Sequence, residues 1–240
     1  GRLLRLTSVW VRVVLDTGHE GWGESTPLVG YNDNDAIEIA RYSEKLAHQS
    51  VGLTIEEVIR NTIFPKDGFL FSAYLTALES CCLVYPETEG VVPLIGLAEE
   101  RAEETPSQCL ERLRQIGYQT YKIKVGCAHL DEDLRRLQSF QNALLQREHL
   151  RVDANQALNA SETKSLVEVC DPSLIQFLEQ PMRVGCEEEM IEICQSHGVR
   201  LLLDESVKDT NAINFLSKSG FIGGVKLKWM KLGTYERLVK

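Results

Sequence analysis

The chain has 240 residues, of which 43% are hydrophobic and 25% are charged, an ordinary balance for a globular protein. Its formal net charge of −9, without any run rich in lysine and arginine, argues against a nucleic-acid partner. No apolar stretch is long enough to span a bilayer, so we expect no membrane partner either. The seven cysteines are odd in number and scattered, without a C-x-x-C pair, which is typical of a reducing compartment and predicts a cytoplasmic protein.

The first part of the chain predicts an α+β domain over residues 1–90. Val9–Leu15 alternates between apolar and other residues, Asp16-Thr17-Gly18 is a turn signal, and Gly21–Ser25 follows as a returning strand. Together these segments predict an antiparallel hairpin. Three helices are expected next, near 33–49, 54–61 and 69–84.

The remainder of the chain, residues 91–240, alternates short apolar strands with amphipathic helices. Thr105 and Pro106 open one helix, and Asn159 with Glu162 has the spacing of a capping box at another. Strands are expected near 91–97, 120–125, 150–153, 174–178, 200–203 and 224–228. This alternation predicts an α/β fold with a parallel sheet. Six strands are too few for an eight-stranded barrel, so we expect the natural protein to contain more barrel at its C-terminus.

Five of these strands end at a charged residue, and the spacing is about one strand plus one returning helix. The residues are Lys124, Asp153, Glu179, Asp204 and Lys228. In a parallel barrel such positions converge on one mouth, where active sites are built. Three carboxylates there would repel one another, and a hard cation such as Mg²⁺ or Mn²⁺ relieves that repulsion. The alternative is that each carboxylate caps a helix or pairs with a lysine.

Lys122 and Lys124 form a K-x-K pair, which places both side chains on one face of their strand. Lysines held close together disfavour each other's charged form, and a lysine so affected can act as a base near neutral pH. The alternative is an edge strand whose lysines point into solvent. Lys226 and Lys228 repeat the pattern on the last strand, and Lys228 is expected to lie opposite Lys124. Two lysines on opposite faces of a substrate can remove a proton from one face and return it to the other.

Three polar residues directly follow the predicted ligand positions: Asn155, Gln180 and Glu205. Each could orient a metal ligand or a lysine. Each could equally be an ordinary loop residue, with Asn155 and Glu205 the stronger candidates for a role at the site.

These motifs resemble the enolase superfamily, and within it the muconate lactonizing enzyme subgroup. The resemblance rests on the order and spacing of GWGES at 21–25, KIK at 122–124, DAN at 153–155, LEQP at 178–181, DES at 204–206 and KLKWMKLG at 226–233. It covers nearly the whole chain. It implies a (β/α)7β TIM-like barrel, here C-terminally incomplete, with a partial N-terminal α+β capping domain.

The resemblance also implies roles for the site residues. Mg²⁺ is expected on Asp153, Glu179 and Asp204, with Lys124 and Lys228 as acid and base. Lys122 is expected to hold the substrate carboxylate, and we group Asn155, Glu205 and Lys226 with it as substrate-binding or orienting residues.

The implied reaction is removal of a proton α to a carboxylate through a metal-stabilised enediolate, by an isomerase acting as an epimerase, racemase or cycloisomerase. One alternative is a lyase of the o-succinylbenzoate synthase type, which eliminates water. Another is a catalytically silent barrel that serves as a binding module. The expected partner is a small-molecule carboxylate, and the family's tendency to assemble is compatible with a homo-oligomer.

Overall fold

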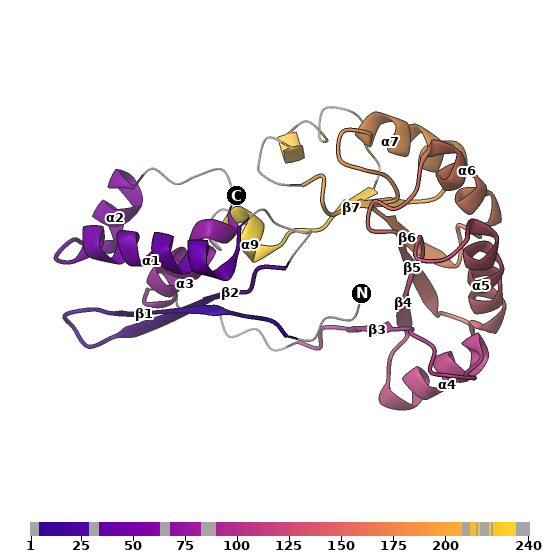
Figure 1. Ribbon diagram of the computed structural model, residues 1–240. Coiled ribbons are helices and arrows are strands. Elements are labelled where there is room, and N and C mark those ends of the chain that lie inside the picture. Colours follow the sequence, from indigo (N-terminus) through magenta and orange to yellow (C-terminus); the bar gives the residue numbers. More distant parts are fainter. Residues whose placement is uncertain are drawn as a thin grey trace. The chain divides into compact units, whose positions relative to one another are not determined.

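The computed structural model describes residues 5–28, 34–62, 68–82, 90–207, 212–214, 216, 221 and 223–233. By its internal contacts the chain divides into two compact units (Figure 1). The first comprises Gly1–Thr88 and Leu227–Lys240, and the second comprises Glu89–Lys226. The boundary near Thr88 lies close to the predicted division at residue 90. The return of the chain to the first unit at Leu227 had no signal in the sequence, and the two predicted domains stay a prediction.

The first unit contains the expected hairpin and three helices. Its elements are β1 (Val9–Val14), β2 (Glu20–Ser25), α1 (Ala36–Ser50), α2 (Ile55–Asn61), α3 (Phe69–Ser80) and the short α9 (Trp229–Leu232). The two strands pair antiparallel, with Val9 opposite Ser25 and Val14 opposite Glu20, so the predicted hairpin is confirmed. Capping boxes at Asp35 and Thr54 begin the first two helices.

Helix α3 rests directly on the backbone of β2, because β2 carries glycine at two of its inward positions. A Cβ at Gly21 would lie 1.9 Å from the carbonyl oxygen of Ala77, and a Cβ at Gly23 would lie 1.9 Å from that of Ala73. The Trp22 N–H also donates a hydrogen bond to Ser80 Oγ at 2.8 Å. The two glycines that flank Trp22 are therefore packing residues, because the absence of a side chain lets α3 contact the backbone of β2.

Replacing Gly23 with alanine is expected to destabilise the first unit by about 2 kcal/mol, because backbone atoms must move to admit the new methyl group. Urea denaturation followed by tryptophan fluorescence measures this, since all three tryptophans belong to the first unit. Gly90→Ala is the control, because no heavy atom lies within 4 Å of a Cβ built there. A Gly23 variant as stable as the control would show that α3 does not rest on the β2 backbone.

The second unit is a curved sheet of six strands in the order β3-β4-β5-β6-β7-β8, and every neighbouring pair is parallel. The strands are β3 (Ile95–Leu97), β4 (Thr120–Lys124), β5 (His149–Asp153), β6 (Ile175–Glu179), β7 (Leu201–Leu203) and β8 (Gly223–Val225). Figure 1 shows helices along the outer side of this sheet. They are α4 (Pro106–Ile116), α5 (Leu130–Ala143), α6 (Ala160–Val169) and α7 (Glu187–Ser196). The predicted alternation and the parallel sheet are confirmed.

The predicted capping residues begin their helices as expected. Thr105 and Asn159 each form a capping box, and Gly117 ends α4 with a left-handed φ of 104°. The core lies between the sheet and the helices, where Tyr121 and Ile123 of β4 are fully buried. The two lysines of β4 consequently occupy the opposite face of the sheet from the helices.

Two strand predictions were too long. The first strand was expected from residue 91, but it begins at Ile95, because Pro93 lacks the N–H that a ladder requires. The last strand was expected to reach residue 228, but it ends at Val225. Lys226 adds one more ladder bond, from its N–H to Leu203 O at 2.8 Å, and Lys228 is the residue that precedes α9.

Candidate metal and proton-transfer site

The three candidate metal ligands lie side by side at one edge of the sheet. Asp153 ends β5, Glu179 ends β6 in register with it, and Asp204 directly follows β7. Because the strands are parallel, their carboxyl ends share one edge. All three side chains are buried, with 1–2% of their surface exposed. Buried carboxylates require positively charged partners or a bound cation.

Two lysines lie between the three carboxylates, so that negative and positive side chains alternate along the row. Lys122 Nζ is 2.7 Å from Asp153 Oδ2 and 2.8 Å from Glu179 Oε2. Lys226 Nζ is 2.7 Å from Glu179 Oε1 and 3.3 Å from Asp204 Oδ2. Glu179 therefore accepts one lysine on each of its two oxygens, and the row of charges is continuous from β5 to β7.

Lys226 is held in its charged form by this arrangement. Burial alone lowers its pKa, but the hydrogen bond to Glu179 and the charges of Glu179 and Asp204 outweigh burial, so the pKa is raised above its ordinary value. Its ammonium group is therefore the counter-ion of Glu179 and Asp204 in this structure.

Lys124 is in a different setting from Lys122, although both are on β4. Its side chain is 52% exposed, and its Nζ lies 3.9 Å from Asp153 Oδ2, at the limit of an ion pair. Its hydrogen-bond acceptor is Asn155 Oδ1, at 2.6 Å. The ammonium group of Lys124 therefore lies at the rim of the site, where it is accessible to solvent and is oriented by the side-chain amide of Asn155.

Asn155 connects Lys124 to Glu205. Its backbone N–H donates to Asp153 Oδ1 at 3.0 Å, and its Nδ2 donates to Glu205 Oε1 at 3.2 Å. Its φ of 43° is in the left-handed region, which asparagine tolerates better than most residues. Glu205 is 8% exposed, and within the described residues its Oε2 is buried without a hydrogen-bond partner. An unsatisfied buried carboxylate oxygen of this kind is unusual away from functional sites.

Gln180 fixes the loop that carries Asp204. Its side chain is fully buried, and its Oε1 accepts the N–H groups of Asp204 at 3.0 Å and Ser206 at 3.1 Å. Its Nε2 donates to Ser206 Oγ at 2.8 Å, and that hydroxyl donates to Glu187 Oε1 at 2.6 Å. Gln180 thereby holds the third carboxylate against the end of β6.

Arg136, which no sequence motif singled out, anchors the end of β4 from helix α5. Its Nη1 donates to the carbonyl of Lys124 at 2.8 Å, and its guanidinium also pairs with Glu100. The only sequence signal was an arginine on an otherwise ordinary helix face, which does not reveal a partner on a neighbouring strand.

Lys228 belongs to the first unit, where it precedes α9. Its predicted position opposite Lys124 stays a prediction, and so do the roles of the other site residues.

The three carboxylates supply only oxygen ligands and come from adjacent strands, which suits a hard divalent cation. In this structure the ammonium groups of Lys122 and Lys226 lie between them. Among the residues that the structure describes, no group of three or more His, Cys, Asp or Glu side chains is arranged to hold a metal ion. The assignment of Asp153, Glu179 and Asp204 as metal ligands therefore stays a prediction.

A family model described as Enolase C-terminal domain-like matches residues 104–240, more than half of the chain. The chain belongs to the enolase superfamily. The resemblance inferred from the motifs is confirmed, and so is the fold class: the six parallel strands and outer helices of the second unit have the architecture of a partial (β/α) barrel, and an N-terminal α+β region precedes it in the chain. In the described part of the chain, no helix combines the length and apolar character that crossing a membrane requires.

The chain is similar over most of its length to isomerases of this superfamily. It is 32% identical to an L-Ala-D/L-Glu epimerase of Francisella tularensis subsp. novicida, over 90% of this chain and 69% of the relative. The muconate lactonizing enzyme of Pseudomonas putida superposes with a TM-score of 0.85 at 20% identity, over 98% of this chain and 71% of that one.

A third relative is a dipeptide epimerase from Cytophaga hutchinsonii, whose structure is complexed with Mg and the dipeptide D-Ala-L-Val. Its TM-score is 0.82 at 19% identity, over 97% of this chain and 67% of that one. At these identities the two solved structures establish the fold alone, whereas relatives such as the 32% identical epimerase support an isomerase-type enzyme.

Proposed function

We propose that this protein is a Mg²⁺-dependent isomerase that removes and returns a proton α to the carboxylate of a small molecule. Epimerisation, racemisation and cycloisomerisation are the outcomes of this step that its relatives suggest. The observation that carries the proposal is the row of three buried carboxylates at the ends of β5, β6 and β7, with Lys124 exposed at its rim.

In this proposal Asp153, Glu179 and Asp204 hold the ion, and Mn²⁺ is an acceptable substitute. When bound, Mg²⁺ would supply positive charge for the oxygens of the substrate carboxylate. Lys122, which bridges Asp153 and Glu179, would also donate to the substrate carboxylate.

Lys124 in its neutral form would accept the α-proton. The C–H bond breaks, its electron pair moves toward the carboxylate, and the nitrogen gains the proton. Return of a proton from Lys228 to the opposite face would invert the configuration at that carbon, and its return from Lys124 would restore it. Asn155 positions Lys124 through the 2.6 Å hydrogen bond, and Glu205 in turn orients Asn155.

Titration of Mg²⁺ into the metal-free protein by calorimetry tests the ion site. Saturable binding is expected, and it should disappear in Asp204→Asn, because one of three charged ligands is lost. Asp171→Asn is a matched control, since Asp171 is exposed, lies outside the row of carboxylates, and accepts hydrogen bonds at its side chain from the N–H and hydroxyl of Ser173. Absence of binding in the unmodified protein, or equal binding in both variants, would refute the ion site.

The lyase alternative is separated from the isomerase by product analysis in deuterium oxide. An epimerase or racemase incorporates deuterium at the α-carbon without a change in substrate composition, whereas an o-succinylbenzoate synthase type of reaction loses water. If dipeptides, muconate-type acids and succinylbenzoate precursors all fail to react while Mg²⁺ binds, the silent binding module becomes the better description.

Cytoplasmic location and homo-oligomer formation belong to the same proposal. The first rests on the scattered cysteines and the second on the superfamily's habit of assembly. Light scattering of the purified chain measures the second directly.

A further inference from the structure

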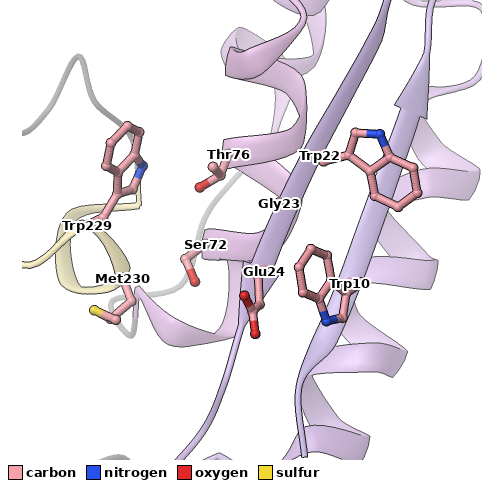
Figure 2. Close-up of a pocket in the computed structure, with 8 residues that line it drawn as sticks. All are labelled: Trp10, Trp22, Gly23, Glu24, Ser72, Thr76, Trp229 and Met230. Atoms are coloured by element: carbon pink, nitrogen blue, oxygen red, sulfur yellow. The ribbon is translucent and has the colours of Figure 1, made fainter.

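All three tryptophans of the chain line one pocket in the first unit, although they come from distant positions in the sequence. Trp10 lies on β1, Trp22 on β2 and Trp229 on α9 (Figure 2). The cavity has a volume of about 280 Å³, which is at the lower end for a ligand site and suits a small molecule.

Two of these tryptophans are exposed on the solvent face of the hairpin. Trp10 is 62% exposed and Trp22 is 51% exposed, while the other face of the hairpin rests on α3. Tryptophan is on average strongly buried, and exposed tryptophans are typical of binding sites. The ring of Trp22 already attracts one cation, because Arg12 Cζ lies 5.7 Å from its centroid.

The polar groups of the pocket are acceptors and hydroxyls. Figure 2 shows Glu24 next to Trp10, with Ser72 and Thr76 of α3 between the hairpin and Trp229. Among the eight lining residues Glu24 is the only charged one. Its Oε1 accepts from Thr26 Oγ1 at 2.9 Å, and within the described residues no ion pair joins it to a basic side chain. Aromatic faces with one carboxylate complement a positive charge.

We propose that this pocket binds a small organic ammonium ion, either an amine or a quaternary ammonium. The electron-rich faces of the tryptophans would contact its alkyl groups, and Glu24 would balance its charge. The residues that line this pocket include none of those placed in the proposed catalytic site, although Trp229 directly follows Lys228 in the chain. A second copy of the chain is the competing occupant, and the cavity volume and the single carboxylate favour the small cation over it.

Choline titrated into the whole chain, with tryptophan fluorescence as the readout, tests the proposal. The signal reports on this pocket alone, since all three tryptophans line it. A saturable change with a Kd of about a millimolar is expected. The neutral isostere, in which a tert-butyl group replaces the trimethylammonium group, should produce no saturable change at the same ionic strength.

Two variants identify the residues responsible. Glu24→Gln and Trp10→Leu are each expected to weaken choline binding about threefold, and both sites are exposed enough to keep the fold. Glu44→Gln, an exposed residue of α1 in the same unit with the same change in charge, should bind as the wild type does. Equal responses to choline and its isostere, equal binding by the two glutamate variants, or a signal that follows protein concentration instead of choline would each overturn the proposal.

Discussion

Replacing Lys124 with methionine is expected to slow exchange of the substrate α-hydrogen with solvent about a thousandfold while Mg²⁺ binding persists. Lys124 is the lysine at the rim of the carboxylate row, and methionine retains its length without the amine. The measurement is deuterium incorporation by mass spectrometry, alongside calorimetric titration of Mg²⁺. Lys164→Met, on the exposed side of α6, is the control and should exchange at the wild-type rate.

The second proton-transfer residue is tested by the same assay on Lys228→Met and Lys231→Met. Lys228 precedes α9 and Lys231 lies within it, so the two variants change neighbouring positions of one segment. The proposal expects Lys228→Met to abolish formation of the inverted product, while Lys231→Met retains it. The reverse result would move the assignment to Lys231, and wild-type exchange in Lys124→Met would contradict the mechanism itself.

Replacing Glu148 with alanine is expected to lower the free energy of unfolding by about 3 kcal/mol or more, because it removes one member of a largely buried ion pair. Arg114 Nε and Nη2 donate to the two oxygens of Glu148 at 2.7 and 2.9 Å, and Tyr121 OH donates at 2.7 Å. The two charged side chains are 16% and 8% exposed. Without Glu148, the guanidinium would lose its buried counter-ion and keep the Ala143 carbonyl and the exposed Glu111 as acceptors, while the phenol would keep the Tyr118 carbonyl.

The same pair predicts a pH dependence. Burial alone would raise the pKa of Glu148, but hydrogen bonds from Arg114, from the Leu145 N–H and from Tyr121 outweigh it and lower the pKa below 4.5. The stabilisation is therefore present above about pH 4.5 and is lost as the pH falls through the depressed folded-state value. The stability difference between wild type and Glu148→Ala should shrink below about pH 4.

Urea denaturation followed by circular dichroism, at about pH 7 and about pH 3, measures both effects. Glu111→Ala is the matched control, because Glu111 also pairs with Arg114 but is 60% exposed. Its loss is expected to cost less than about 1 kcal/mol. If the two variants were equally stable, the Arg114–Glu148 pair would not contribute to the core.

The local features of the fold could be read from the residues themselves. Thr105 and Asn159 cap helices because a short polar side chain satisfies N–H groups a few residues away, which depends on nothing distant. The β4 alternation placed Tyr121 and Ile123 on the face opposite Lys122 for the same reason. Periodic apolar runs likewise predicted the parallel sheet, and the charged residue at the end of each run indicated where a site would form.

Contacts between strands were decided by the tertiary structure. Lys122 and Lys226 are 57 and 47 residues away from Glu179, and only strand register and loop length bring both ammonium groups to its two oxygens. Register also gives the two β4 lysines different surroundings, since Lys122 is enclosed between carboxylates and Lys124 is left at the rim. No periodicity in the sequence distinguishes them.

Local patterns and spacing in the chain were enough to predict the superfamily, the strand-helix order and the polar residues at the strand ends. Which charges pair, and where the last strand stops, became known from the folded structure. It also decided that three tryptophans from distant positions share one pocket. These outcomes depend on packing between segments far apart in the chain, where each contact forms only after both partners have been placed by the rest of the fold.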